Sequence, residues 1–154
     1  MTTLSCSNLT KEYTGKKVVN NVSVNVSTGK VVGLLGPNGA GKTTTFYMLV
    51  GLIKSDGGEI KIENQIVTSL PMHTRSNLGI SYLPQEASIF KNLTVEENIL
   101  AILQVKKDLT KKDQDQKLND LIEMLQISNI TKSNGASLSG GERRRVEIVR
   151  ALAI

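Results

Sequence analysis

The stretch Gly36-Pro37-Asn38-Gly39-Ala40-Gly41-Lys42-Thr43-Thr44 decides the fold of this chain. It fits the pattern Gly-x-x-x-x-Gly-Lys-Ser/Thr, in which glycines let backbone N–H groups close around phosphate oxygens. In such a loop the lysine reaches the β- and γ-phosphates of a nucleotide, and the hydroxyl that follows it ligates Mg²⁺. Lys42 and Thr43 are therefore the expected phosphate and magnesium contacts, and the amides from Gly39 to Thr44 are expected to wrap the β-phosphate of ATP.

The residues on either side of this loop have the order that a phosphate loop requires. The apolar run Val31–Leu35 predicts a buried strand, and residues 44–50 predict a helix that ends near Gly51. A plain glycine-rich helix cap is the alternative reading. The agreement between the full pattern and its strand-loop-helix context favours a nucleotide-binding α/β protein.

A second segment, Leu138-Ser139-Gly140-Gly141-Glu142, has a serine and two glycines where a helix is expected to open. Ser139 and Glu142 have the spacing of a capping box. A helix start presents unpaired N–H groups and a positive dipole end, so this segment is also suited to receive an anion.

The remaining pattern divides the chain into a strand-rich first half and a helical second half. Strands are predicted over residues 3–10 and 17–26, with a turn at Gly15 and with one valine face formed by Val18, Val22, Val24 and Val26. A turn at residues 55–58 precedes a predicted hairpin over 59–67. After Pro84, capping boxes at residues 94–97 and 110–113 predict helices, and a core-facing stripe is expected at Leu118, Leu121, Ile122 and Leu125.

Composition limits the classes of protein that remain. The 154 residues are 39% hydrophobic, which suits a single domain with a core, and no apolar run reaches the ~20 residues of a membrane span. The N-terminus lacks the pattern of a secretory signal, so a cytoplasmic location is expected. The single cysteine, Cys6, excludes an internal disulfide and is expected to be buried in the first strand.

The net charge of +5 does not predict a nucleic-acid partner. The densest lysine cluster, Lys106-Lys107 with Lys111-Lys112, is interleaved with aspartates and contains no aromatic residue, so a solvated helix face is expected. His73 is the only histidine and is expected to be a surface residue rather than a metal ligand.

The phosphate loop, Leu83-Pro84-Gln85-Glu86 and the Leu138–Glu142 signature together resemble the ATP-binding subunits of ABC transporters over essentially the whole chain. The resemblance implies an α/β P-loop NTPase of the ABC ATPase type, with N-terminal strands, a parallel sheet and a helical subdomain. One domain is expected over 1–154, made of a strand-rich nucleotide-binding core (1–86), a helical subdomain (87–138) and a signature helix (139–154).

More narrowly, residues 79–90 and 137–148 are similar to the ATPases that power lipopolysaccharide export. Branched-chain amino acid importer subunits are the nearest competitor. The run Pro84-Gln85-Glu86-Ala87-Ser88-Ile89-Phe90 favours the lipopolysaccharide exporters.

The resemblance also assigns roles to single residues. Tyr13 matches the aromatic residue that stacks on adenine, although a strand-end tyrosine packed on the core is the alternative. Gln85 matches the residue that touches Mg²⁺ or the attacking water and signals to the membrane subunits. Ser139 and Gly141 match residues that bind the γ-phosphate held by a partner subunit, which implies a head-to-tail homodimer on the cytoplasmic face of the inner membrane, docked on transmembrane permease subunits.

Family members continue past the signature helix into an apolar strand that ends in Asp-Glu, and the glutamate polarises the attacking water. No such strand occurs in these residues, so we expect an ATPase domain with an incomplete parallel sheet and no hydrolysis by this chain alone. A nucleotide-binding regulatory module without turnover is the alternative. A DNA-repair ATPase is disfavoured because the insertion between Gln85 and Ser139 is too short for a long coiled coil. Arg143, Arg144 and Arg145 are expected to line the dimer face or to pair with Glu142 and Glu147.

Overall fold

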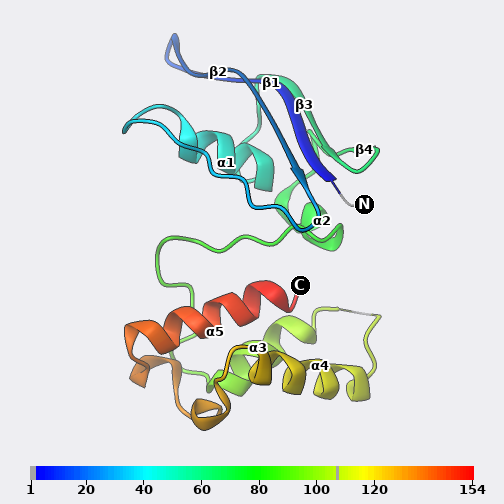
Figure 1. Cartoon of the computed structure of the whole chain (residues 1–154), viewed down its shortest axis with the longest axis vertical. Coiled ribbons are helices and arrows are strands. Elements are labelled where there is room, and N and C mark those ends of the chain that lie inside the picture. Colours follow the sequence, from blue (N-terminus) through cyan, green and yellow to red (C-terminus); the bar gives the residue numbers. More distant parts are fainter. Residues whose placement is uncertain (1–2, 107) are drawn as a thin grey trace. The chain divides into compact units, whose positions relative to one another are not determined.

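The computed structural model describes residues 3–106 and 108–154. They form two compact units, one up to residue 80 and one from residue 81, and the elements of both are labelled in Figure 1. Lys107, which belongs to the expected solvated lysine cluster, lies outside the described residues. Lys111 and Lys112 of that cluster are exposed, as expected.

The first unit is a four-stranded sheet with a helix packed on it (Figure 1). The strands are β1 (Thr3–Tyr13), β2 (Lys16–Ser27), β3 (Gly57–Ile62) and β4 (Gln65–Ile66), in the order β2-β1-β3-β4 with every pairing antiparallel. The helices are α1 (Lys42–Val50) and α2 (Met72–Asn77). Both N-terminal strands, the hairpin and the helix after the phosphate loop are confirmed.

The core of this unit joins α1 to the sheet. Its buried members come from β1, β2, α1, β3 and the residue after β4: Cys6, Leu9, Val19, Met48, Leu49, Ile60, Ile62 and Val67. Cys6 is buried in β1 as expected, and His73 is exposed as expected. The burial of these side chains determines the face of the sheet on which α1 packs, because each Å² of apolar surface removed from water stabilises the fold by about 25 cal/mol.

The valine face of β2 differs in detail from the expected one. Val19 is 2% exposed, whereas Val18 is only half-buried. The register of β1 against β2 shifts between the Leu9–Val22 and Lys11–Val19 pairs, and Asn21 has a left-handed φ of 53°. An extra residue in one strand reverses the inward and outward alternation, which period-2 reasoning does not anticipate.

The predicted buried strand at Val31–Leu35 is wrong for this structure. The segment has no strand assignment, Val31 is 100% exposed and Leu35 is 92% exposed. The expected parallel sheet is also wrong for the described residues: every strand pairing among them is antiparallel, and this segment is not part of the sheet. An apolar run becomes a buried strand only when neighbouring strands pair with its backbone and other elements cover its faces.

The second unit is helical. It contains α3 (Val95–Leu103), α4 (Lys111–Met124), α5 (Gly140–Leu152) and two short 3₁₀ helices, η1 (Ser128–Ile130) and η2 (Gly135–Ser137). Capping boxes open α3, α4 and α5 at Thr94, Thr110 and Ser139, as the sequence predicts. The expected stripe on α4 faces the core: Leu118, Leu121 and Ile122 are buried, and Leu125 packs against them.

The described residues lack two kinds of feature, a membrane-spanning helix and a cluster of metal-binding side chains. None of their helices has both the length and the apolar character needed to cross a bilayer. They also contain no group of three or more histidine, cysteine or acidic side chains arranged to hold a metal ion.

Candidate functional site

The phosphate loop turns into α1 at a glycine that no other residue can replace without strain. Gly41 is the residue before the first helical turn and has φ 82°, and Gly39 has φ 80°. A Cβ built on Gly41 would lie 2.2 Å from the carbonyl oxygen of Val18 on β2. The loop therefore depends on glycine both for its backbone angle and for its close approach to the sheet.

Lys42 places its charge against the start of the loop. Its Nζ donates to the carbonyl oxygen of Gly36 at 2.8 Å and to that of Pro37 at 2.7 Å. These two bonds link the first residues of the motif to the first residue of α1. The ammonium is therefore held within the loop instead of extending freely into solvent.

The N-terminal end of α1 presents groups that suit a phosphate. The amide of Thr45 donates to the carbonyl of Gly41 at 2.8 Å and begins the helical ladder. Within the described part of the chain, the amides of Lys42, Thr43 and Thr44 have no backbone carbonyl partner. Unpaired amides, the positive end of the helix dipole and a nearby ammonium all favour an anion at this position, and the Thr43 side chain beside them is exposed.

Tyr13 ends β1 and is 43% exposed, so the packed-core alternative does not describe it. Lys11 Nζ lies 5.4 Å from the centroid of the Tyr13 ring. Lys11 in turn donates to Asp56 Oδ1 at 2.7 Å. The aromatic side chain is therefore held beside a paired cation and keeps an open surface.

The signature segment forms the start of α5. Ser139 donates through its backbone N and its Oγ to Glu142 Oε2, at 2.9 and 2.7 Å, and Ser139 Oγ accepts from the Glu142 amide at 3.4 Å. These bonds, first from the hydroxyl and then from the amide of Ser139, hold the pKa of Glu142 below its usual value. A Cβ built on Gly140 or Gly141 would meet nothing within 4 Å, so the start of this helix is open to an external group.

Helix α5 also holds the segment that contains Gln85. Glu147, which is 4% exposed, accepts from the Ser88 amide at 2.7 Å. Arg144 Nη1 donates to the Pro84 carbonyl at 2.8 Å and to Glu147 Oε2 at 3.3 Å, and Arg150 donates to the Ser88 carbonyl. Of the two alternatives expected for Arg143, Arg144 and Arg145, pairing with an acidic neighbour holds for Arg144, which forms an ion pair with Glu147.

Sequence reasoning missed the contacts between α5 and residues 84–88. The bonded residues lie about sixty positions apart, and no local spacing rule connects them. An acidic residue on the otherwise apolar face of α5, next to Val146, was the available signal. Such a residue is buried only when it is paired.

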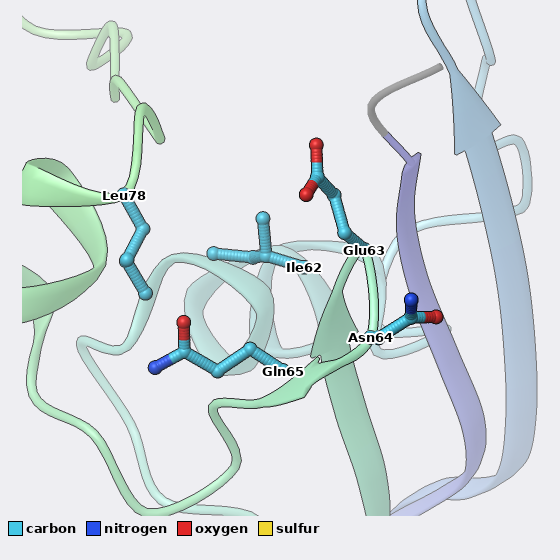
Figure 2. Close-up of a pocket in the computed structure, with 5 residues that line it drawn as sticks. All are labelled: Ile62, Glu63, Asn64, Gln65 and Leu78. Carbon is cyan, nitrogen blue, oxygen red and sulfur yellow. The ribbon is translucent and has the colours of Figure 1, made fainter.

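The expected site residues fall into two groups. Tyr13 and the loop residues 36–44 belong to the first unit, whereas the exposed Gln85 and the signature residues 138–142 belong to the second. A separate open pocket of about 520 Å³ in the first unit is lined by Ile62, Glu63, Asn64, Gln65 and Leu78 (Figure 2). Figure 2 shows Ile62, Gln65 and Leu78 around a shared space, with Asn64 directed away from it. This pocket contains none of the expected site residues.

Comparison with curated proteins gives close relatives over nearly the whole chain. The lipopolysaccharide export system ATP-binding protein LptB of Haemophilus influenzae is 56% identical over 153 residues, which are 99% of this chain and 64% of that protein. The protein of the same name from Escherichia coli K12 is 54% identical over the same shares. A probable ABC transporter ATP-binding protein of Azorhizobium caulinodans is 53% identical over 150 residues. The chain thus spans 64% of the length of the two LptB proteins and 53% of that of the Azorhizobium caulinodans protein.

Solved structures agree with this relationship. The ADP conformation of an ATP-binding cassette of an ABC transporter has a TM-score of 0.82 and 28% identity, covering 99% of this chain and 65% of that one. The dimeric structure of a bacterial ABC transporter cassette has a TM-score of 0.80 and 26% identity, covering 97% of this chain and 69% of that one. The expected P-loop NTPase fold of the ABC ATPase type is thereby confirmed. The ABC transporter family model matches residues 19–154, and the chain belongs to that family.

Proposed function

We propose that this chain supplies the ATP-binding part of an ABC transporter ATPase that powers lipopolysaccharide export. The geometry of the phosphate loop carries the proposal: the Lys42 ammonium is held by two loop carbonyls next to the unpaired amides that open α1. A nucleotide phosphate would take the place of those carbonyls as the partner of the ammonium. The charge and the donors are already in position before the ligand arrives, which reduces the ordering cost of binding.

Each proposed contact has a defined chemical task. Lys42 neutralises charge on the β- and γ-phosphates, the amides of residues 39–44 bind phosphate oxygens, and the Thr43 hydroxyl ligates the Mg²⁺ that accompanies ATP. Tyr13 offers its ring to the adenine base. Gln85 contacts Mg²⁺ or the attacking water, and its segment is held by α5 through Pro84 and Ser88.

The signature residues are proposed to act on a second copy of the chain. Ser139 and Gly141 stand at the open start of α5, where amides and the helix dipole favour an anion. The γ-phosphate of ATP bound to the partner copy would be that anion, which gives a head-to-tail homodimer. A related cassette has been solved as a dimer, which supports association of two copies.

The transported substrate is proposed from the relatives. Proteins named for lipopolysaccharide export are 54–56% identical to this chain over 99% of its length. The proposed partners are therefore the permease subunits of that exporter, and the proposed location is the cytoplasmic face of the inner membrane. A branched-chain amino acid importer subunit remains the competing assignment.

A chimera tests the proposal directly. Residues 1–154 are joined to the C-terminal third of the Haemophilus influenzae relative, and ATP hydrolysis is measured by phosphate release. We expect turnover by the chimera, none by residues 1–154 alone, and loss of turnover in the Lys42→Ala chimera with the fold intact. Hydrolysis at the parent rate by the Lys42→Ala chimera would contradict the assigned role of the loop.

The transport assignment is tested with the same chimera in Escherichia coli depleted of its own LptB. Restored growth is expected, and the Lys42→Ala chimera should fail to restore it. A chimera that hydrolyses ATP but does not support growth would refute the lipopolysaccharide assignment. The assignment as an ABC ATPase would survive that result.

A further inference from the structure

The end of β1 carries a cation that the proposed function does not use. Lys11 Nζ lies 5.4 Å from the centroid of the Tyr13 ring, within the range of a cation–π interaction. The Lys11 side chain is only 14% exposed and is paired with Asp56 at 2.7 Å. Water therefore competes less for this ammonium than for an ordinary surface lysine.

Asp56 fixes three consecutive residues at the end of the strand. Its Oδ1 accepts from Lys11, its Oδ2 accepts from the Glu12 amide at 2.8 Å, and its own amide donates to the Thr10 carbonyl at 2.9 Å. The pairing of β1 with β2 is irregular between Lys11 and Glu12. The Asp56 bonds thus support the backbone at one of the irregular points of the β1–β2 pairing, next to Tyr13.

Asp56 is ionised at neutral pH. The hydrogen bond from Lys11, followed by the bond from the Glu12 amide, holds its pKa below the usual range. The ion pair therefore persists under the conditions in which a nucleotide would bind. An uncharged residue at position 56 could not form this ion pair and so would not hold Lys11 beside the Tyr13 ring.

We propose that Lys11, held by Asp56, is a positioning residue for the base of the bound nucleotide and acts through the Tyr13 ring. This inference rests on the proposed function, in which Tyr13 contacts adenine. A cation on a ring attracts its π electrons, and the ring then offers a better surface to an electron-rich purine. The contact also limits the orientations of the Tyr13 side chain, so less ordering is needed when the base arrives.

The effect of Lys11 on the base of ATP can be measured apart from its effect on the phosphates. Inorganic triphosphate has no ring, so an effect that passes through Tyr13 leaves its affinity unchanged. A general electrostatic effect of Lys11 would alter the affinity for ATP and for triphosphate together. The ratio of the two affinities therefore distinguishes positioning of the base from attraction of the phosphates.

The test measures dissociation constants of ATP and of inorganic triphosphate for the 154-residue chain by calorimetry. Lys11→Met should weaken ATP binding by roughly two- to fivefold and leave triphosphate binding unchanged. Lys11→Arg, which keeps the cation, should restore ATP affinity. Lys61→Met is the matched control, because Lys61 forms an ion pair with Glu59 on the same sheet without a contact to Tyr13.

A double-mutant cycle completes the test. In a Tyr13→Leu background, Lys11→Met should have no further effect on ATP binding. Additive effects, or an equal loss of triphosphate affinity, would overturn the inference. If Tyr13→Leu leaves ATP affinity unchanged while Lys42→Ala removes it, the inference falls together with the proposed contact of Tyr13 with adenine, and the proposed role of the phosphate loop stands. If the unmodified chain and Lys42→Ala bind ATP equally, both fall.

Discussion

The phosphate loop contains two glycines with nearly the same backbone angle and very different surroundings. Gly39 has φ 80° and Gly41 has φ 82°. A Cβ on Gly39 would meet nothing within 4 Å, whereas a Cβ on Gly41 would lie 2.2 Å from the Val18 carbonyl oxygen and 3.1 Å from a methyl carbon of Val19. Substitution of each by alanine therefore separates the cost of the backbone angle from the cost of the contact.

The expected magnitudes follow from these two costs. Alanine in the left-handed region costs about 1–2 kcal/mol, and both variants bear that cost. Gly41→Ala must also move the loop away from β2, and such overpacking costs typically about 1–3 kcal/mol more. Gly41→Ala should thus lower the free energy of unfolding by about 2–5 kcal/mol, a large part of the ~5–15 kcal/mol available to a domain.

Urea unfolding followed by far-ultraviolet circular dichroism measures the difference. Gly79→Ala is a control outside the loop, since Gly79 has φ 93° and open space around its Cβ position. Gly39→Ala and Gly79→Ala should show similar, smaller losses. If Gly41→Ala is no less stable than Gly39→Ala, to within about 0.5 kcal/mol, the close approach of the loop to β2 is not real.

Three further predictions concern the rest of the chain. Gly141→Asp should abolish ATP-dependent dimerisation of the chimera in light scattering, because its carboxylate would repel the partner's γ-phosphate; the open space at this position should leave the monomer fold and its ATP binding unchanged. The buried Arg75 guanidinium donates to four backbone carbonyls, those of Met48, Leu49, Thr68 and Leu70. Arg75→Met should therefore lower the free energy of unfolding, measured in urea, by about 3 kcal/mol or more, because these carbonyls lose their donor. Arg145→Met, at an exposed position, is the control and should change it little. Ser139→Ala should reduce the acid sensitivity of thermal unfolding, because the Ser139 hydroxyl lowers the pKa of Glu142. A lowered pKa gives stability that is present above the usual glutamate value of 4.5 and is lost as the pH falls through the lower folded-state pKa. An unchanged pH profile of the melting temperature in the variant would refute this linkage.

The sequence was sufficient to predict those elements whose start or end depends on residues only a few positions apart. The capping boxes at Thr94, Thr110 and Ser139 all form, because a hydroxyl and a carboxylate three positions apart satisfy the helix start by themselves. The end of α1 at Gly51, with φ 85°, follows for the same kind of reason. The phosphate loop was also predictable, because its glycines and its lysine carry the chemistry in one continuous stretch.

The sequence by itself determined the family, the two N-terminal strands, the hairpin over residues 59–67 and the capped starts of three helices. Tertiary structure decided the features that depend on distant partners. These are the register shift in β2 that buries Val19, the hydrogen bond from the Ser88 amide to Glu147, and the ion pair between Lys11 and Asp56. It also decided that Val31–Leu35 is exposed, although its composition predicts burial. Periodicity records how apolar a segment is, whereas its burial depends on which other segments pack against it and satisfy its backbone.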